Sequence, residues 1–162
     1  MPQFNKITSL LETVEDMAPS GFAIAFHLRL TSSELQFQTY PKKWTQIYSE
    51  RGYVMSDPCV AWAFQNTGRT RWSDLAEMDT LDILGQGAEF GMKFGASVGV
   101  ENGTTRSIAG FARPDREYTD AELDQLFVHV QQLHDLTASE TGMSEELREE
   151  LLRLSIEMTH PS

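Results

Sequence analysis

The sequence predicts an α+β domain in which an antiparallel sheet is sandwiched between helices. Apolar residues recur at helical spacing in residues 3–17 and again in the last third of the chain. Between these stretches lie two pairs of strand-like segments, 22–30 with 35–40 and 95–100 with 107–112, each pair joined by turn-like residues. Strands grouped in this way, with helices before and after them, favour an antiparallel sheet with helices packed on its faces.

The composition bounds the classes of protein to which the chain can belong. Its 162 residues and 40% hydrophobic content predict one domain with a packed core. The net charge is -11, and the stretch from Asp115 onward holds twelve acidic residues against three arginines, so the basic stripe of a DNA binder is missing. The sequence has one cysteine, no apolar run of membrane-spanning length and no signal peptide at its start. We therefore expect a protein of the reducing cytoplasm that binds no membrane and, by itself, no nucleic acid.

The first half of the chain reads as a helix, two strands and two further helices. Residues 3–17 form an amphipathic helix that APSG ends. The segment FAIAFHLRL alternates, and we expect one face to hold Phe22, Ile24, Phe26, Leu28 and Leu30 and the other Ala23, Ala25, His27 and Arg29. LQFQTY is the returning strand. Pro41 suits the first turn of a helix that runs to about Arg51, and Asp57 caps the next helix with Pro58 at its first position.

The second half adds a hairpin and long helices. Residues 69–72 read as a short extended piece, and 79–94 read as helical although three glycines weaken that helix. GASVGV and SIAGFA flank ENGTT, whose Asn-Gly pair favours a hairpin. Thr119 and Glu122 form a capping box, and the helix after it carries an apolar stripe of Leu123, Leu126, Phe127, Val130, Leu133 and Leu136. Gly142 ends this helix, and a shorter one follows.

Four aromatic residues with polar ring atoms gather in YPKKWTQIYSERGYVMSDP. Trp44 and Tyr48 are four residues apart and share a helix face, with Tyr40 one turn earlier. Buried Tyr hydroxyls and Trp NH groups need partners, whereas the carboxylate of Asp57 only accepts. Such donors and one acceptor among apolar residues suit a small amphiphile whose head carries carbonyls and an NH. The alternatives are that the aromatic pair only packs in the core and that Asp57 only caps its helix.

The sequence contains no pattern that predicts catalysis or a metal site. Its four histidines have no metal-ligand spacing, no Gly-x-Ser-x-Gly elbow occurs, and GQGAEFG lacks the lysine of a phosphate-binding loop. Cys59, near a helix start, reads as a buried thiol that contacts a ligand rather than as a reactive one. We therefore expect a binding protein that is not an enzyme and that uses no metal or cofactor apart from its small-molecule ligand.

The outline of a sheet between helices is shared by PAS- and GAF-type sensor domains. Over roughly residues 20–137 the chain more specifically resembles the autoinducer-binding domain of LuxR-type quorum-sensing regulators. The resemblance is carried by the spacing YPxxW-xxx-Y-xxxx-Y-xxx-DP, by the later WSDL and by FGMKFGASVGVENG. It implies an α-β-α sensor domain that holds an N-acyl homoserine lactone in a buried pocket.

The resemblance also implies roles for single residues. Trp44 looks like the tryptophan whose indole NH holds the lactone carbonyl, and Asp57 like the aspartate that accepts from the ligand amide. Tyr40 matches the tyrosine that bonds the acyl carbonyl. Tyr48 and Trp72 match aromatic residues that form walls around the ligand. We expect further ligand contacts from Cys59, Ala23, Ala25, Met92, Ser97 and Ala112.

The sequence departs from the family pattern at several positions. Ala112 stands about where many relatives place a Ser or Thr that helps to bind the acyl carbonyl, and Gly99 replaces the usual proline. His27, Gln36 and Gln38 are expected at the solvent rim, since such side chains are mostly exposed. The alternative is that they face inward, which would imply an oxidised, short or aryl acyl chain.

The resemblance finally bears on domains and partners. We expect residues 1–140 to form the sensor domain and 141–162 a helical tail or the start of a linker. DNA would be contacted only through a helix-turn-helix domain absent from this chain, which is then an excised domain or a natural truncation. A homodimer through the stripe that begins at Leu123 is expected, unless that stripe closes the core of a monomer.

Two other functions stay open from the sequence. In the first, the chain is a truncated relative that heterodimerises with a full-length regulator and inhibits it. In the second, it is a sensor of the same fold for a non-lactone molecule.

Overall fold

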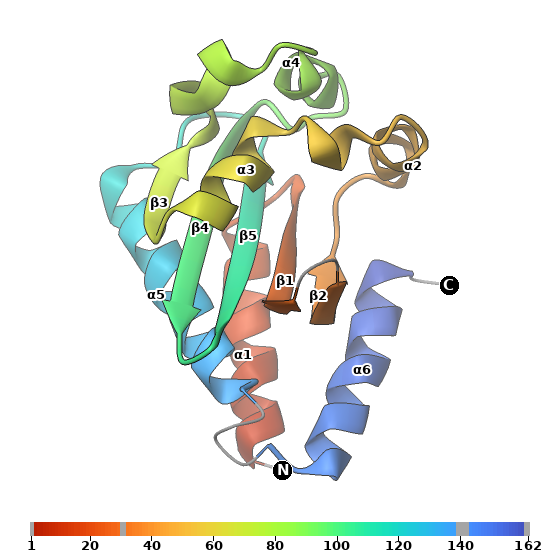
Figure 1. Ribbon diagram of the computed structural model, residues 1–162, viewed down its shortest axis with the longest axis vertical. Coiled ribbons are helices and arrows are strands. Elements are labelled where there is room, and N and C mark those ends of the chain that lie inside the picture. The colour runs from red at the N-terminus through yellow and green to blue at the C-terminus, as the bar shows by residue number, and fades with distance from the viewer. Residues whose placement is uncertain (1, 30–31, 139–142, 161–162) are drawn as a thin grey trace.

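A five-stranded antiparallel sheet lies between two layers of helices (Figure 1), in a computed structural model that describes residues 2–29, 32–138 and 143–160. The elements are α1 (Pro2–Asp16), β1 (Gly21–Arg29), β2 (Ser32–Gln38), α2 (Lys42–Glu50), the 3-10 helix η1 (Tyr53–Met55), α3 (Pro58–Gln65), β3 (Gly68–Arg71), the 3-10 helix η2 (Trp72–Met78), α4 (Ile83–Ala88), β4 (Phe94–Asn102), β5 (Thr105–Arg113), α5 (Asp120–Leu136) and α6 (Glu145–Thr159). The strand order is β2-β1-β5-β4-β3. The predicted α+β sandwich is confirmed.

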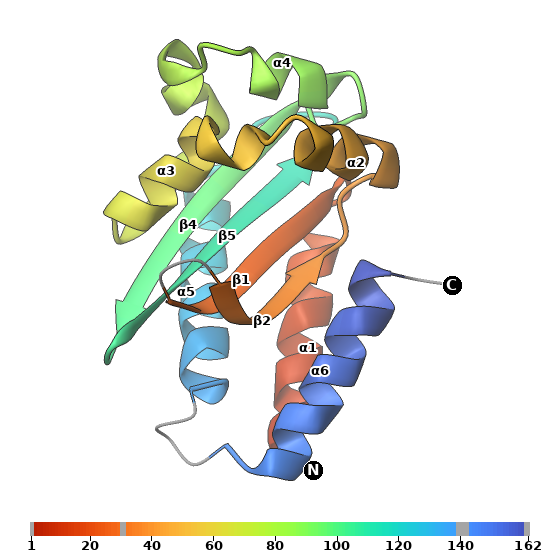
Figure 2. The same ribbon diagram turned by 45° about the vertical axis from the view of Figure 1, so that its right-hand side comes forward.

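Helices α1 and α5 cover one face of the sheet, and α2, α3 and α4 cover the other (Figure 2). Ile7, Leu11 and Val14 of α1 are buried against the sheet, as their helical spacing predicts. On α5 the stripe Leu123, Leu126, Val130 and Leu133 is fully buried in the same core. The stripe therefore closes the core of a single chain, and the prediction that it forms a dimer interface is wrong.

Strand β1 contains a bulge that changes which side chains face the core. Phe22, Ile24 and Phe26 are fully buried on the side of α1 and α5. The pairing of β1 with β5 then shifts register between Ala25 and Leu28, and His27 adopts a positive φ of 54°. Leu28 consequently points to the opposite face, which corrects the prediction that it shares a face with Phe22. Leu30, also placed on that face, lies outside the described residues.

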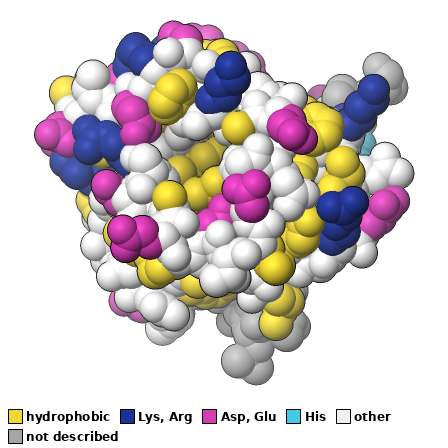
Figure 3. All heavy atoms as spheres, turned by 90° about the horizontal axis from the view of Figure 1, so that it is seen from above, with side chains coloured by type: hydrophobic (Ala, Val, Ile, Leu, Met, Phe, Trp, Pro, Cys, Tyr) yellow, Lys and Arg dark blue, Asp and Glu magenta, His cyan; other side chains and the backbone are white. Residues whose placement is uncertain are grey.

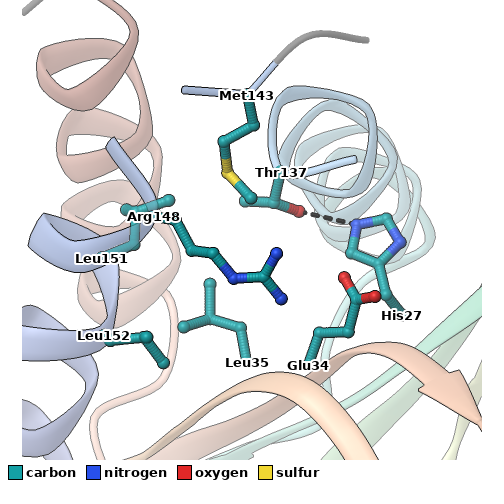
Figure 4. Close-up of a pocket in the computed structure, with 8 residues that line it drawn as sticks. All are labelled: His27, Glu34, Leu35, Thr137, Met143, Arg148, Leu151 and Leu152. Atoms are coloured by element: carbon teal, nitrogen blue, oxygen red, sulfur yellow. Dashed lines mark hydrogen bonds between the residues drawn. The ribbon is translucent and has the colours of Figure 1, made fainter. Parts of the chain in front are cut away.

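His27 is buried in a polar network, not at the solvent rim as expected. Its Nδ1 lies 2.7 Å from Thr105 Oγ1 and its Nε2 lies 2.9 Å from Thr137 Oγ1, and Figure 4 shows this second bond at the end of α5. Ser107 accepts from the His27 backbone N at 3.1 Å and lies 2.6 Å from Nδ1 of His134. Nε2 of His134 must donate to the Asn102 carbonyl at 3.1 Å, so its Nδ1 accepts from Ser107.

The segment between η2 and β4 is less helical than the sequence predicts. Only Ile83–Ala88 form α4, because the Asp79 carboxylate accepts from the backbone N of Ile83 and Leu84 at 2.9 and 2.8 Å and so fixes the start of the helix. Gly91, with φ of 91°, turns the chain toward β4.

Helix α6 packs along the free edge of β2 (Figures 1 and 2). Leu147 and Leu151 are buried in the core that α1 and α5 form with the sheet. The Ser155 hydroxyl donates to the Gln36 carbonyl, and the Gln38 backbone N donates to Thr159 Oγ1 at 3.1 Å. The predicted break at Gly142 and the predicted boundary between residues 140 and 141 lie outside the described residues.

In the described part of the chain, none of the helices combines the length and the apolar character needed to cross a membrane.

Candidate functional site

A cavity of about 1070 Å³ lies between the sheet and the helices α2, α3 and α4. Figure 3 looks onto this end of the molecule, where the surface is hollowed and hydrophobic side chains show inside the hollow. Ten of the eleven predicted ligand contacts line the cavity: Ala23, Ala25, Tyr40, Trp44, Tyr48, Asp57, Cys59, Trp72, Met92 and Ser97. The volume is at the upper end of the range for small-molecule sites.

The sheet gives the cavity a floor of small residues. Ala23 and Ala25 of β1 contribute, and Gly110 of β5 pairs directly with Ala23. The eleventh predicted contact, Ala112, is fully buried among the aromatic residues but does not line the cavity. Gly110, two residues earlier on the same face of the strand, lines the cavity.

Tyr40 lies directly above this glycine. A Cβ at position 110 would be only 2.6 Å from the Tyr40 hydroxyl, so the bare backbone makes room for it. Burial, followed by the nearby Asp57, raises the pKa of Tyr40 well above its ordinary value. The hydroxyl therefore stays protonated and is available as a hydrogen-bond donor.

An aromatic cluster forms the wall on the side of α2. The ring of Trp44, which is 4% exposed, lies 5.9 Å from Tyr48, 6.1 Å from Tyr53 and 5.7 Å from Phe90, measured between centroids. The pair Tyr48–Tyr53 is edge-to-face at 6.0 Å. Trp44 and Tyr48 share a helix face as predicted. Phe90 was missed because it lies in a glycine-rich loop with no periodic pattern.

Asp57 caps α3, as its place before Pro58 predicts, and also accepts a hydrogen bond from Tyr48. Its Oδ1 accepts from the Cys59 backbone N at 2.8 Å, which caps α3, and its Oδ2 accepts from the Tyr48 hydroxyl at 2.7 Å. Burial, and then the carboxylate, raise the pKa of Tyr48 far above its ordinary value. Two donors thus hold the carboxylate at the cavity wall, and its remaining lone pairs can accept from a ligand.

Cys59 lies beside Asp57 with its side chain 8% exposed. Burial raises the pKa of its thiol, and the Asp57 charge raises it further. The thiol is therefore protonated at neutral pH and unreactive, as the sequence suggested. Cys59, Ser97 and Met92 together line the cavity between α3, β4 and the loop before it.

Trp72, the first residue of η2, forms the opposite wall. A Cβ on Gly95 would be 2.0 to 2.3 Å from the indole, so the ring lies flat on the β4 backbone at this glycine. Trp72 is 8% exposed, and no acceptor for its Nε1 is found among the described residues.

The two ends of the cavity differ in polarity. Gln36 and Gln38 of β2 line it from the sheet edge. Gln36 is exposed there, as expected of the solvent rim, and Gln38 is half-buried. Around the mouth stand apolar side chains that are about half exposed or more: Val54, Met55, Phe64 and Met78. No pattern in the sequence predicts these residues, because their placement depends on how short helical turns meet in space.

A metal site does not form within residues 2–29, 32–138 and 143–160, since no group of three or more His, Cys, Asp or Glu side chains there could hold an ion.

Comparison with known proteins identifies the domain. The model of the autoinducer binding domain family matches residues 10–138. The transcriptional activator protein VanR of Vibrio anguillarum is 30% identical over 116 residues, which are 69% of this chain and 48% of VanR. The chain thus spans about half the length of this curated relative.

Two solved structures have a similar fold. The N-acylhomoserine lactone-dependent LuxR family transcription factor CepR2 from Burkholderia cenocepacia superposes with a TM-score of 0.60 at 19% identity, covering 78% of this chain and 77% of that one. SdiA in complex with octanoyl-rac-glycerol gives a TM-score of 0.58 at 15% identity, covering 80% and 57%.

The matched family is a ligand-binding domain of quorum-sensing transcription regulators and not a family of enzymes. Its model spans the helices and strands that enclose the cavity described above. The chain belongs to the autoinducer-binding domain family of LuxR-type regulators.

Proposed function

We propose that the cavity between the sheet and α2–α4 binds an N-acyl homoserine lactone and that this chain is the sensing unit of a transcription regulator. The observation that carries the proposal is the fixed carboxylate of Asp57, held by Tyr48 and by the start of α3 at the wall of a large apolar cavity. Such an acceptor fits a ligand NH, and a hydrogen bond to a charged acceptor is stronger than a neutral one.

The remaining groups fit the other polar atoms of such a ligand. The Trp44 indole, on the same wall as Asp57, offers a donor to the lactone carbonyl, and Tyr40 offers one to the acyl carbonyl. The floor of Ala23, Ala25 and Gly110 leaves space for an acyl chain to lie along the strands. An N-acyl amide left unpaired in this setting would cost about 1–3 kcal/mol.

A non-lactone amphiphile is a second candidate, because the structurally similar SdiA has been solved with octanoyl-rac-glycerol. A glycerol head would use the same donors but has no NH for Asp57. The Gln36 and Gln38 amides at the other end of the cavity favour a chain with a polar group near its end. The two ligand classes therefore differ most in their dependence on Asp57.

The test is thermal unfolding of the parent protein with a panel of N-acyl homoserine lactones and with 1-octanoylglycerol. A ligand present at 100 times its dissociation constant adds about 2.7 kcal/mol to the unfolding free energy, which shifts the midpoint by several degrees. Stabilisation by a lactone is expected. If the panel leaves the midpoint unchanged and octanoylglycerol raises it, the ligand is a non-lactone amphiphile.

Calorimetric titration of variants locates the site. Trp44→Phe and Asp57→Asn should each weaken lactone binding about tenfold or more, since each leaves a ligand group unpaired. Asn is still a good helix cap, so α3 should persist. Trp62→Phe is the matched control, because Trp62 lines the rim from α3 and is half-buried. If Trp44→Phe and Asp57→Asn both bind as the parent does, the head group binds elsewhere.

We also propose that the regulator works as a homodimer and contacts DNA only through a further domain. With the α5 stripe buried, Leu152 and Ile156, one turn apart on α6 and 41% and 62% exposed, are the better candidates for a contact between copies. Sedimentation of the parent and of Ile156→Glu tests this. A monomeric parent with lactone bound would exclude the homodimer. The cytoplasmic setting stays a prediction.

A further inference from the structure

The cavity between the sheet and α2–α4 is closed at one end and open at the other. Around Asp57 the walls are only 4% to 8% exposed, and they are formed by Trp44, Cys59, Trp72 and Met92. At the β2 end, Gln36 is exposed, and Gln38 and Leu28 are half-buried. A closed head site therefore continues into a groove that is open to solvent.

The arrangement of the helices leaves this end of the sheet open. Helix α3 packs on β4 and β5. Figure 2 shows α2 near the upper ends of β1 and β2, and no described helix over their lower ends on the cavity face. The bulge at His27 adds Leu28 to this uncovered face. The floor of the cavity thus extends beyond the helices that cover the head site.

The two sides of this groove differ in chemistry. On the helix side, Val54 of η1 and Phe64 of α3 line the cavity and are 52% and 47% exposed. On the strand side stand the amide side chains of Gln36 and Gln38. Exposed apolar side chains that border a cavity are a surface for an apolar ligand. The groove therefore suits an alkyl chain that lies against α3 and ends beside polar groups in water.

The geometry of β1 indicates how long such a chain has to be. Ala23 pairs with Gly110, over which Tyr40 lies. From Ala23 to Leu28 the strand advances roughly 15 Å at about 3.3 Å per residue, and somewhat less because of the bulge. An extended chain of carbons with bonds of about 1.5 Å advances roughly 1.3 Å per carbon. A chain of about ten carbons therefore reaches the groove, whereas one of about six ends in the closed part.

We propose that the ligand is a long-chain N-acyl homoserine lactone whose chain end leaves the closed part of the cavity through the groove between α3 and β2 and meets solvent. The inference rests on the proposed lactone function and names the acyl chain that the function leaves open. It also accounts for the exposure of Val54 and Phe64. Binding should then tolerate a bulky polar group on the last carbon of the chain and reject the same group near the head.

The test compares three lactones by calorimetric titration of the parent protein. The first is N-dodecanoyl homoserine lactone. The second carries a neutral triethylene glycol ether on the last carbon of the same chain, and the third carries this ether on the fifth carbon. The end-tagged lactone should bind within about threefold of the untagged one, since its tag stays in water. The mid-chain tag should weaken binding at least about tenfold, because it has to enter the closed part.

A variant of β2 tests the path of the chain. Gln36→Trp should narrow the groove, since residue 36 is exposed and lines it. Gln46→Trp is the matched control, because Gln46 is exposed on α2 and does not line the cavity. Gln36→Trp should weaken the end-tagged lactone about tenfold and leave N-hexanoyl homoserine lactone within twofold of the parent. Gln46→Trp should bind both as the parent does.

The outcomes separate this proposal from the lactone function. If the parent binds the untagged lactone and both tags weaken binding equally, the chain end is enclosed, and only the groove proposal is wrong. If Gln36→Trp weakens the end-tagged lactone no more than Gln46→Trp does, the chain does not leave between α3 and β2. A parent that binds none of the untagged lactones overturns the lactone function and the groove proposal with it.

Discussion

The two faces of the same sheet are built from opposite kinds of side chain. Toward α1 and α5 the strands present large residues that are fully buried, such as Phe22, Val98 and Phe111. Toward α2–α4 the neighbours of these residues in sequence are Ala23 and Gly110, and the space above them is a cavity. Because successive residues of a strand point to opposite faces, packing and ligand space alternate residue by residue. Stability and binding can therefore be changed separately.

Polar groups differ between the faces in the same way. On the α5 face, His27, Ser107 and His134 bond one another or backbone groups at 2.6 to 3.1 Å. On the cavity face, the Tyr48 hydroxyl donates to the Asp57 carboxylate at 2.7 Å, and both residues line the cavity. Loss of the α5-side network should therefore change folding, whereas loss of the cavity pair should change binding. The comparison predicts where a substitution changes folding and where it changes binding.

The largest effect is expected from the core side of β5. Phe111→Ala should lower the unfolding free energy by about 3–5 kcal/mol, from the lost burial and the cavity that remains. Urea denaturation measures the loss, and Phe111→Leu, at about 1.5 kcal/mol or less, serves if the first variant is too unstable. The adjacent Gly110→Ala should lower the unfolding free energy by under about 1 kcal/mol. It should nevertheless weaken lactone binding, because the added Cβ displaces the Tyr40 hydroxyl. Equal effects of both on stability would contradict the comparison.

A smaller loss of unfolding free energy is expected when the polar network around His27 is broken. Ser107→Ala leaves the His27 backbone NH and the His134 Nδ1 without their hydroxyl partner, which should destabilise the fold by about 1–3 kcal/mol. Lactone affinity should not change. The control Ser73→Ala removes an exposed hydrogen bond to Glu117 and should stay within about 0.5 kcal/mol. A Ser107→Ala variant as stable as this control would show that the network adds little.

The smallest effect depends on pH and involves neither face. Hydrogen bonds from Arg116 lower the pKa of Glu122 to about 2 in the folded chain, against about 4.3 when unfolded. The stabilisation is therefore complete above the unfolded value and is lost as the pH falls toward 2. Glu122→Gln should cost roughly 1 kcal/mol or less at pH 7, since the pair is partly solvated.

Stability curves of parent and Glu122→Gln recorded between pH 7 and 3 provide the measurement. The two curves should converge as the pH falls. Asp124→Asn on the same helix, where the carboxylate is 68% exposed, should change stability by no more than about 0.5 kcal/mol. A Glu122 effect that persists at full size at pH 3 would contradict the pKa assignment.

Local chemistry was enough to predict most elements and most of the predicted residues that line the cavity. The caps at Asp57 and Thr119 fixed two helix starts, and the aromatic spacing from Tyr40 to Asp57 brought together one wall of the cavity. These features depend on neighbours a few residues away, so the sequence displays them directly.

Features that depend on tertiary contacts were not predictable in the same way. FAIAFHLRL alternates without a visible interruption, yet His27 forms a bulge because its ring finds partners on α5 and β5. Ala112 was predicted as a ligand contact, and only the folded chain shows that Gly110, on the same strand face, lines the cavity under Tyr40 while Ala112 does not line it. The apolar stripe of α5 could equally have met another chain or its own sheet, and spacing alone does not say which.

The helix α6 has a consequence for how the chain behaves among other copies of itself. An edge strand such as β2 can pair with a strand of another molecule and extend the sheet, unless its backbone groups are already hydrogen-bonded. Here Ser155 and Thr159 engage the Gln36 carbonyl and the Gln38 amide, so growth of the sheet stops at this edge. A fragment that ended before α6 would keep every cavity residue and still expose that template. We expect such a fragment to form fibrils or insoluble oligomers, although the residues that line its pocket are unchanged.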